Sequence, residues 1–178
     1  MTDREMWNLA VAAVGAGHAA LPPDRKALVA GLAGAVREGK EALHAIAEGV
    51  SAAGICAACG GECCRSGKYH VTVVDLLVYL AEGRELFTPA FGQGRCPYLG
   101  DRGCLMAPSY RPFTCVAFNC EQVERLLAPQ EKARAVLLER ELRALYRRFE
   151  EEFTRRFMGG LLQNYERDIV RGRGSILG

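Results

Sequence analysis

The sequence predicts a mainly α-helical protein: a small helical domain with an irregular, cysteine-rich core and a long C-terminal helix. Apolar residues recur three or four positions apart in residues 1–50 and again in residues 121–158, as in amphipathic helices. Between them, residues 51–120 are rich in Gly and Pro and hold all eight cysteines. At 178 residues, we expect one compact domain overall, made of an N-terminal helical extension (1–50), a cysteine cluster (51–120) and a C-terminal long helix and tail (121–178).

The N-terminal segment predicts two helices separated at "LPPD". Pro22-Pro23 ends the first, and Asp24 is expected to cap the second. An apolar stripe then marks the buried face of the second helix, with members Leu28, Leu32, Val36, Leu43 and Ile46. Three glycines on this helix, at 31, 34 and 39, either permit close packing or mark a break, since each costs about 1 kcal/mol relative to Ala.

One regular element is predicted inside the middle segment. "TVVD", Thr72 to Asp75, resembles a capping box with Asp in place of the usual Glu or Gln. An apolar run follows and leads to Gly83, a residue type that commonly ends helices. We therefore expect a short helix here, between two groups of cysteines.

The C-terminal segment carries the clearest helical pattern. After a break at Ala128-Pro129 the apolar stripe comprises Leu138, Leu142, Leu145, Phe149, Phe153 and Phe157. Ion pairs four residues apart, such as Glu139–Arg143 and Glu152–Arg156, should line the solvent side. Gly159-Gly160 is expected to end the helix, with a frayed tail beyond. The stripe predicts docking on the core or, alternatively, self-association or contact with a protein partner.

Charge and hydropathy restrict the partners. The net charge of +2 makes nucleic acid an unlikely partner, because no strongly basic character would attract it. No apolar run reaches the roughly 20 residues that span a bilayer, and residues 9–21 lack the basic flank of a secretory signal. We therefore expect no membrane partner and a cytoplasmic protein, a setting in which thiols stay reduced.

The cysteine spacing reads C-x2-C-x3-C-C, C-x7-C and C-x10-C-x4-C. A C-x2-C turn presents two thiolates to one metal ion, while Gly60 and Gly61 let the backbone curl behind Cys59. Cys63 and Cys64 are adjacent, so their side chains should point in different directions. This favours two metal sites, or one site with spare thiols.

Other chemistries for these thiols fit less well. Disulfides require an oxidising compartment, and eight thiols exceed what a redox C-x2-C needs. A cysteine nucleophile needs a base, and His70 is the only histidine among the cysteines. It is a conceivable ligand or base, although a lone histidine is more often structural.

Thiolates favour soft metals, and two kinds of centre remain open. Eight cysteines divide into two tetrahedral zinc sites of four. A [4Fe-4S] cluster also takes four cysteines and often uses a remote one followed by proline, as in Cys96-Pro97. Basic side chains near the cysteines would partly neutralise either centre: Arg65, Lys68, Arg95, Arg102 and Arg111.

The segments "CAACGGECC", "CPYL" and "RPFTCVAFNC", with a lone cysteine between the last two, resemble the signature of the YkgJ-type cysteine-cluster family. These bacterial and archaeal proteins are described as zinc- or iron-chelating domains. The resemblance covers roughly residues 51–120 and implies metal binding by Cys56, Cys59, Cys63, Cys64, Cys96, Cys104, Cys115 and Cys120.

A similar cluster in flagellin lysine methylases, which are associated with an iron–sulfur centre, favours [4Fe-4S] slightly over zinc. No Gly-rich S-adenosylmethionine loop follows a clear strand here, so methyl transfer does not carry over. Arg111-Pro112, part of the resemblance, is interpreted as structural, with the arginine bonding backbone carbonyls or offsetting thiolate charge.

The function expected from these observations is a metal-binding module, structural or electron-transferring, acting as a subunit or accessory factor. The alternative is a metal-dependent enzyme, a transferase or redox enzyme, with an open coordination position. The two differ in whether protein sulfur fills every position on the metal.

Overall fold

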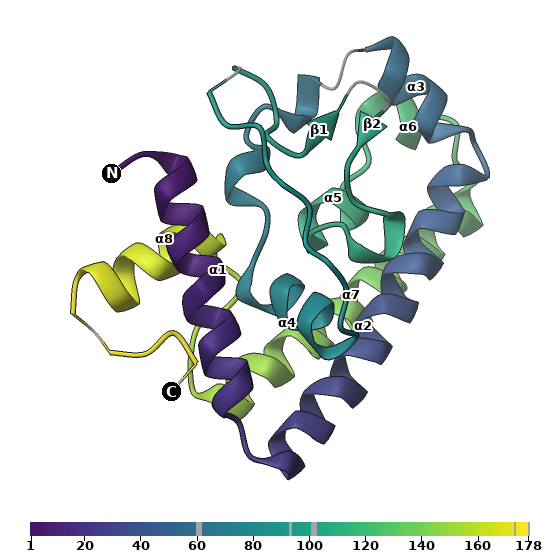
Figure 1. Cartoon of the computed structure of the whole chain (residues 1–178). Helices are drawn as coiled ribbons and strands as arrows, with labels where there is room; N and C mark the ends of the chain where they lie inside the picture. The colour runs from purple at the N-terminus through teal and green to yellow at the C-terminus, as the bar shows by residue number, and fades with distance from the viewer. Residues whose placement is uncertain (60–61, 93, 101–102, 173, 178) are drawn as a thin grey trace.

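The protein is mainly helical, with the long helix near its C-terminus that the sequence predicts (Figure 1). The computed structural model describes residues 1–59, 62–92, 94–100, 103–172 and 174–177. Its elements, in order, are α1 (Asp3–Ala20), α2 (Pro23–Glu48), α3 (Ala52–Ala58), η1 (Glu62–Cys64), η2 (Gly67–Tyr69), α4 (Val73–Ala81), β1 (Leu99–Gly100), β2 (Gly103–Cys104), η3 (Pro108–Tyr110), α5 (Phe113–Ala117), α6 (Glu121–Glu124), α7 (Pro129–Phe153), α8 (Leu161–Tyr165) and η4 (Glu166–Val170).

The first two helices meet at the predicted proline pair. A capping box starts α1, in which Glu5 N donates to Thr2 Oγ1 and Thr2 N donates to Glu5 Oε2. Pro22 is the N-cap of α2 and Asp24 lies inside its first turn, so the prediction of an Asp24 cap is wrong. Pro23 is the first helical residue, where proline is favourable because its fixed φ matches the helix and its missing N–H has no helical acceptor.

The second helix, α2, is the central element of the core. It packs on both α4 and α7, and four members of its predicted stripe are buried: Leu32, Val36, Leu43 and Ile46. The helix continues through its three glycines without a break. At Gly39 a Cβ would lie 3.3 Å from Leu142 Cδ1 on α7, so this glycine permits close packing of the two helices.

Helix α4 is enclosed by its neighbours and begins at the predicted capping box. Every residue from Val73 to Tyr79 is buried. Thr72 Oγ1 accepts from Asp75 N, and the Asp75 carboxylate accepts from Thr72 N, which satisfies two donors at the helix start. After the helix, Gly83 adopts a positive φ of 60°, which confirms its predicted role in ending the helix.

Helix α7 ends earlier than its apolar stripe suggests. It stops at Phe153, and Thr154 takes the left-handed conformation. Phe157 N and Met158 N then donate to Glu150 Oε1, at 2.6 and 2.9 Å, which stabilises the turn. Because Arg156 lies beyond the helix, the pairing predicted for Glu152 is wrong, and Glu152 pairs with Arg25 of α2 at 2.8 Å. The predicted Glu139–Arg143 pair is confirmed at 2.5 Å.

The stripe of α7 is buried within the chain. Leu142, Phe149 and Phe153 are buried where α7 packs on α2. This is the docking arrangement that the spacing predicts. Val136 and Leu137 of the same helix are more than half exposed.

The tail after α8 packs on the first helix. Ile176 and Leu177 are buried, and a Cβ at Gly17 of α1 would lie 2.8 Å from Leu177 Cδ1. The expectation of a frayed tail is therefore wrong for these two residues. Across the part of the chain that the structure describes, no helix combines the length and hydrophobicity needed to cross a membrane.

The middle region, residues 51–120, is built from short elements apart from α4. Strands β1 and β2 form a small antiparallel pair in which Leu99 faces Cys104 and Gly100 faces Gly103. Short helices and loops supply the rest. In Figure 1 its elements α3, β1 and β2 lie at the top of the molecule.

Candidate metal centre

The cysteines come from separate short elements of the middle region. Their described positions are Cys56 in α3, Cys59 just after it, Cys64 at the end of η1, Cys96 before β1, Cys104 in β2, Cys115 in α5 and Cys120 at the N-cap of α6. The side chain of Cys63 lies outside the described residues, so the predicted divergence of Cys63 and Cys64 is untested. None of these described cysteines is in a disulfide.

Four of these residues form a group that we call the inner cysteines: Cys64, Cys96, Cys104 and Cys115. Burial raises the pKa of the Cys115 thiol well above its usual range, and the nearby charges of the other three inner cysteines raise it further. Burial also raises the pKa of Cys96, and Cys104 adds to this effect. Thiols up to 51 positions apart in the chain therefore lie close enough to influence one another's ionisation.

The segment after η1 holds two inner cysteines in place. At Gly67 a Cβ would overlap Cys96 Sγ, so only glycine lets the backbone approach this sulfur. Three residues later, His70 Nδ1 lies 3.3 Å from Cys115 Sγ. Tyr98 OH donates to the Lys68 carbonyl at 3.3 Å, which ties the start of β1 to the same segment.

The remaining described cysteines, Cys56, Cys59 and Cys120, form the outer cysteines. Helix α3 packs against α6, which brings the helix that carries Cys56 against the helix that Cys120 caps. Cys59 Sγ lies 3.4 Å from the Cys56 carbonyl oxygen, across a helical turn. The outer cysteines thus come from α3 and α6, whereas the inner cysteines come from η1, the β1–β2 segment and α5.

Within the described residues, no three His, Cys, Asp or Glu side chains already converge to the spacing of a metal site. The residue types fit a thiolate-bound metal, and the inner cysteines share one neighbourhood. His70 and Cys115 are already adjacent, whereas the other thiols would have to move inward to reach a common ion.

The basic residues near the cysteines have partners of their own. Lys68 Nζ lies 2.9 Å from Asp3 Oδ2, and Arg65 lies 3.4 Å from Glu62 on the surface. Arg111 Nε donates to the Met106 carbonyl at 3.3 Å, which confirms its structural interpretation. Arg102 lies outside the described residues.

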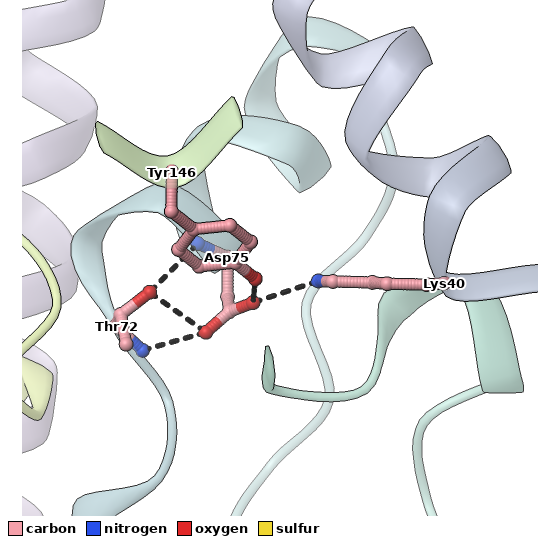
Figure 2. A network of polar contacts seen from close by, with 4 residues as sticks. All are labelled: Lys40, Thr72, Asp75 and Tyr146. Atoms are coloured by element: carbon pink, nitrogen blue, oxygen red, sulfur yellow. Dashed lines mark hydrogen bonds and ion pairs between the residues drawn. The ribbon is translucent and has the colours of Figure 1, made fainter. Parts of the chain in front are cut away.

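A buried polar network joins the side chains of Lys40, Thr72, Asp75 and Tyr146 (Figure 2). Asp75 Oδ1 accepts from Lys40 Nζ at 2.7 Å and from Tyr146 OH at 2.5 Å. Asp75 Oδ2 accepts from both Thr72 N and Thr72 Oγ1 at 2.8 Å. The network joins α2, α4 and α7, and the Asp75 charge also contributes to the raised pKa of Cys115.

The sequence interpretation found Thr72 and Asp75 but missed Lys40 and Tyr146. Lys40 is fully buried in the gap of the α2 stripe, four residues after Val36 and three before Leu43. The sequence did carry one signal for Lys40: a lysine at a predicted core position needs a buried partner of opposite charge, and Asp75 is such a partner. Tyr146 likewise falls on the α7 stripe, four residues after Leu142.

Comparison of this chain with protein-family models, with curated proteins and with solved structures finds no match in any of the three. The resemblance to the YkgJ-type cysteine-cluster family accordingly stays a prediction that rests on the cysteine motifs alone.

Proposed function

We propose that the middle region binds metal through its cysteine thiolates, as a structural or electron-transfer module in the cytoplasm. One observation carries the proposal: the inner cysteines, from η1, the β1–β2 segment and α5, lie near enough to one another for their charges to raise the pKa of Cys115. Without a cation, burial and neighbouring thiolates all oppose ionisation there. A bound metal reverses this, because its charge deprotonates a coordinating thiol.

The exposure of the cysteines argues against a packing role. Free cysteine is among the most buried residue types when it serves as a small apolar side chain. Among the described cysteines, however, Cys96 alone is buried, and Cys56 is exposed. Half-exposed thiols gathered in one short region are better explained as metal ligands than as core residues.

The cofactor in this proposal is a [4Fe-4S] cluster or zinc. The division into inner and outer cysteines supports two centres, since each group comes from a different set of elements. When bound, zinc would supply a structural crosslink and an iron–sulfur cluster would supply electron transfer. The chain's own part is to bring together the thiols and to cover one side of them with η2 and α5.

The test is anaerobic purification of the full chain, followed by iron, zinc and sulfide analysis and an absorption spectrum. We expect at least one metal centre per chain, with iron and sulfide in a brown sample or zinc in a colourless one. Cys115→Ser should lower the metal content, and Thr114→Ala, an exposed change on the same helix, should not. A folded protein that contains neither metal and takes up neither on reconstitution would overturn the proposal.

A further inference from the structure

The contact between His70 and Cys115 is the most specific feature of the cysteine region. His70 directly follows η2, and its Nδ1 atom lies 3.3 Å from Cys115 Sγ. The residue is partly buried, and the packing of Gly67 on Cys96 fixes the short helix that precedes it. The position of the imidazole is therefore set by the same segment that contacts two inner cysteines.

The distance between the two atoms matches the edge of a tetrahedral zinc site. Zinc binds sulfur at about 2.3 Å and nitrogen at about 2.0 Å, so a tetrahedral angle separates the two ligand atoms by roughly 3.5 Å. The observed 3.3 Å is close to this value. In a [4Fe-4S] cluster, by contrast, each protein ligand binds a different iron, so two ligands are separated by the cluster itself.

We propose that His70 is a metal ligand, and that His70, Cys115, Cys104 and Cys64 form a mononuclear zinc site of the Cys3His type. This inference rests on the proposed metal-binding function and specifies the metal and the ligands of the inner centre. Cys96 is excluded from the ligand set because its sulfur is packed against the backbone of Gly67. Cys64 and Cys104 move inward when zinc binds, since they do not yet converge with the other two.

The charges around the site favour a neutral fourth ligand. Four thiolates would leave a zinc site with two negative charges, whereas three thiolates and an imidazole leave one. His70 and Cys115 are both partly buried, where a site of smaller net charge costs less.

The test is X-ray absorption at the zinc edge of the full-length protein, together with cobalt-substituted spectra. The spectrum of a protein in which the outer cysteines 56, 59 and 120 are replaced by serine should fit three sulfurs and one nitrogen. His70→Cys should retain the metal with four sulfurs and stronger sulfur-to-cobalt charge-transfer bands. His70→Asn should weaken zinc binding by at least the roughly 10–100-fold that outer-shell changes cause. His18→Asn and His44→Asn, at the other two histidines, should change neither the ligand count nor the affinity for zinc.

The outcomes separate this inference from the function on which it rests. Zinc bound by four sulfurs and insensitive to His70→Asn would overturn the role of His70 and leave metal binding intact. An iron–sulfur spectrum at the inner cysteines would overturn the mononuclear zinc site in the same way. If neither metal binds to the folded wild type, the proposed function and this inference both fail. Because the spectrum recorded with His70 intact counts the nitrogen directly, a His70 variant that does not fold still leaves the inference testable.

Discussion

The helical core and the cysteine region surround their ionisable side chains in opposite ways. In the helical core, the Asp75 carboxylate is surrounded by donors from its own chain: Lys40, Tyr146 and Thr72. In the cysteine region, the charges that act on the Cys115 thiol all oppose its ionisation. The core network therefore contains its own counter-charge, whereas ionised inner cysteines would need a cation from outside the chain. Under the proposed function, a bound metal supplies that cation and completes the middle region.

The largest expected effect comes from breaking the core network. Asp75→Asn removes the carboxylate but leaves Lys40 buried, and an uncompensated buried charge costs about 3–5 kcal/mol. We expect the free energy of unfolding to fall by about this amount in denaturant titrations. Glu121→Gln, in a pair with Arg125 whose side chains are 75% exposed, should change it by less than about 1 kcal/mol. An Asp75→Asn protein as stable as the Glu121→Gln control would contradict the importance of the network.

A smaller loss is expected at the tyrosine of the same network. Tyr146→Phe removes one hydrogen bond to a charged acceptor, which is worth about 1.5–3 kcal/mol. Thermal and denaturant unfolding measure the effect. In the Asp75→Asn background the same substitution should cost less, because the charged acceptor is already gone. Equal losses of stability in the two backgrounds would show that the Tyr146 hydroxyl does not stabilise the protein through Asp75.

More of the helical core than of the cysteine region could be predicted from the sequence. Burial of one helix face leaves a periodic pattern, so the stripes of α2 and α7 and the start of α4 are readable from the spacing of residues. The same pattern misplaced the end of α7, since Phe157 is buried although the helix stops at Phe153. Phe157 reaches the core from a turn that Glu150 holds, and apolar spacing does not distinguish a turn from a helix here.

The grouping of the thiols had no such periodic signal. The spacing of the cysteines indicates ligands, but loop paths decide which sulfurs meet, and those paths depend on contacts such as Gly67 with Cys96. The pairing of His70 with Cys115 likewise joins residues 45 positions apart. Its only signal in the sequence was the presence of one histidine among the cysteines.

A change at Gly67 should disturb the cysteine region while the core stays folded. Gly67→Ala places a methyl group onto Cys96 Sγ, and overpacking of this kind costs about 1–3 kcal/mol. We expect a lower metal content together with a nearly unchanged far-UV circular dichroism spectrum. Gly54→Ala on α3, where a Cβ meets nothing within 4 Å, should keep the metal. Equal metal contents in the two variants would show that η2 does not position the site.

The smallest expected effect tests the packing of α2 on α7. Gly31→Ala places its methyl group in open space on a helix, and we expect a gain of about 0.5–1 kcal/mol in unfolding free energy. Gly39→Ala should gain less or lose stability, because Leu142 must shift to make room. Denaturant titrations compare the two variants. A larger gain for Gly39→Ala would contradict the close approach of these helices.

Hydrogen–deuterium exchange of the metal-loaded and chelator-treated protein tests the central claim most directly. We predict that chelation removes protection from amides in residues 51–71 and 96–120, because ligand binding energy is folding energy where the metal is integral. Amides of α2, α4 and α7 should keep their protection. Identical exchange in the two samples, with metal removal verified by analysis, would contradict the claim that metal completes the cysteine region.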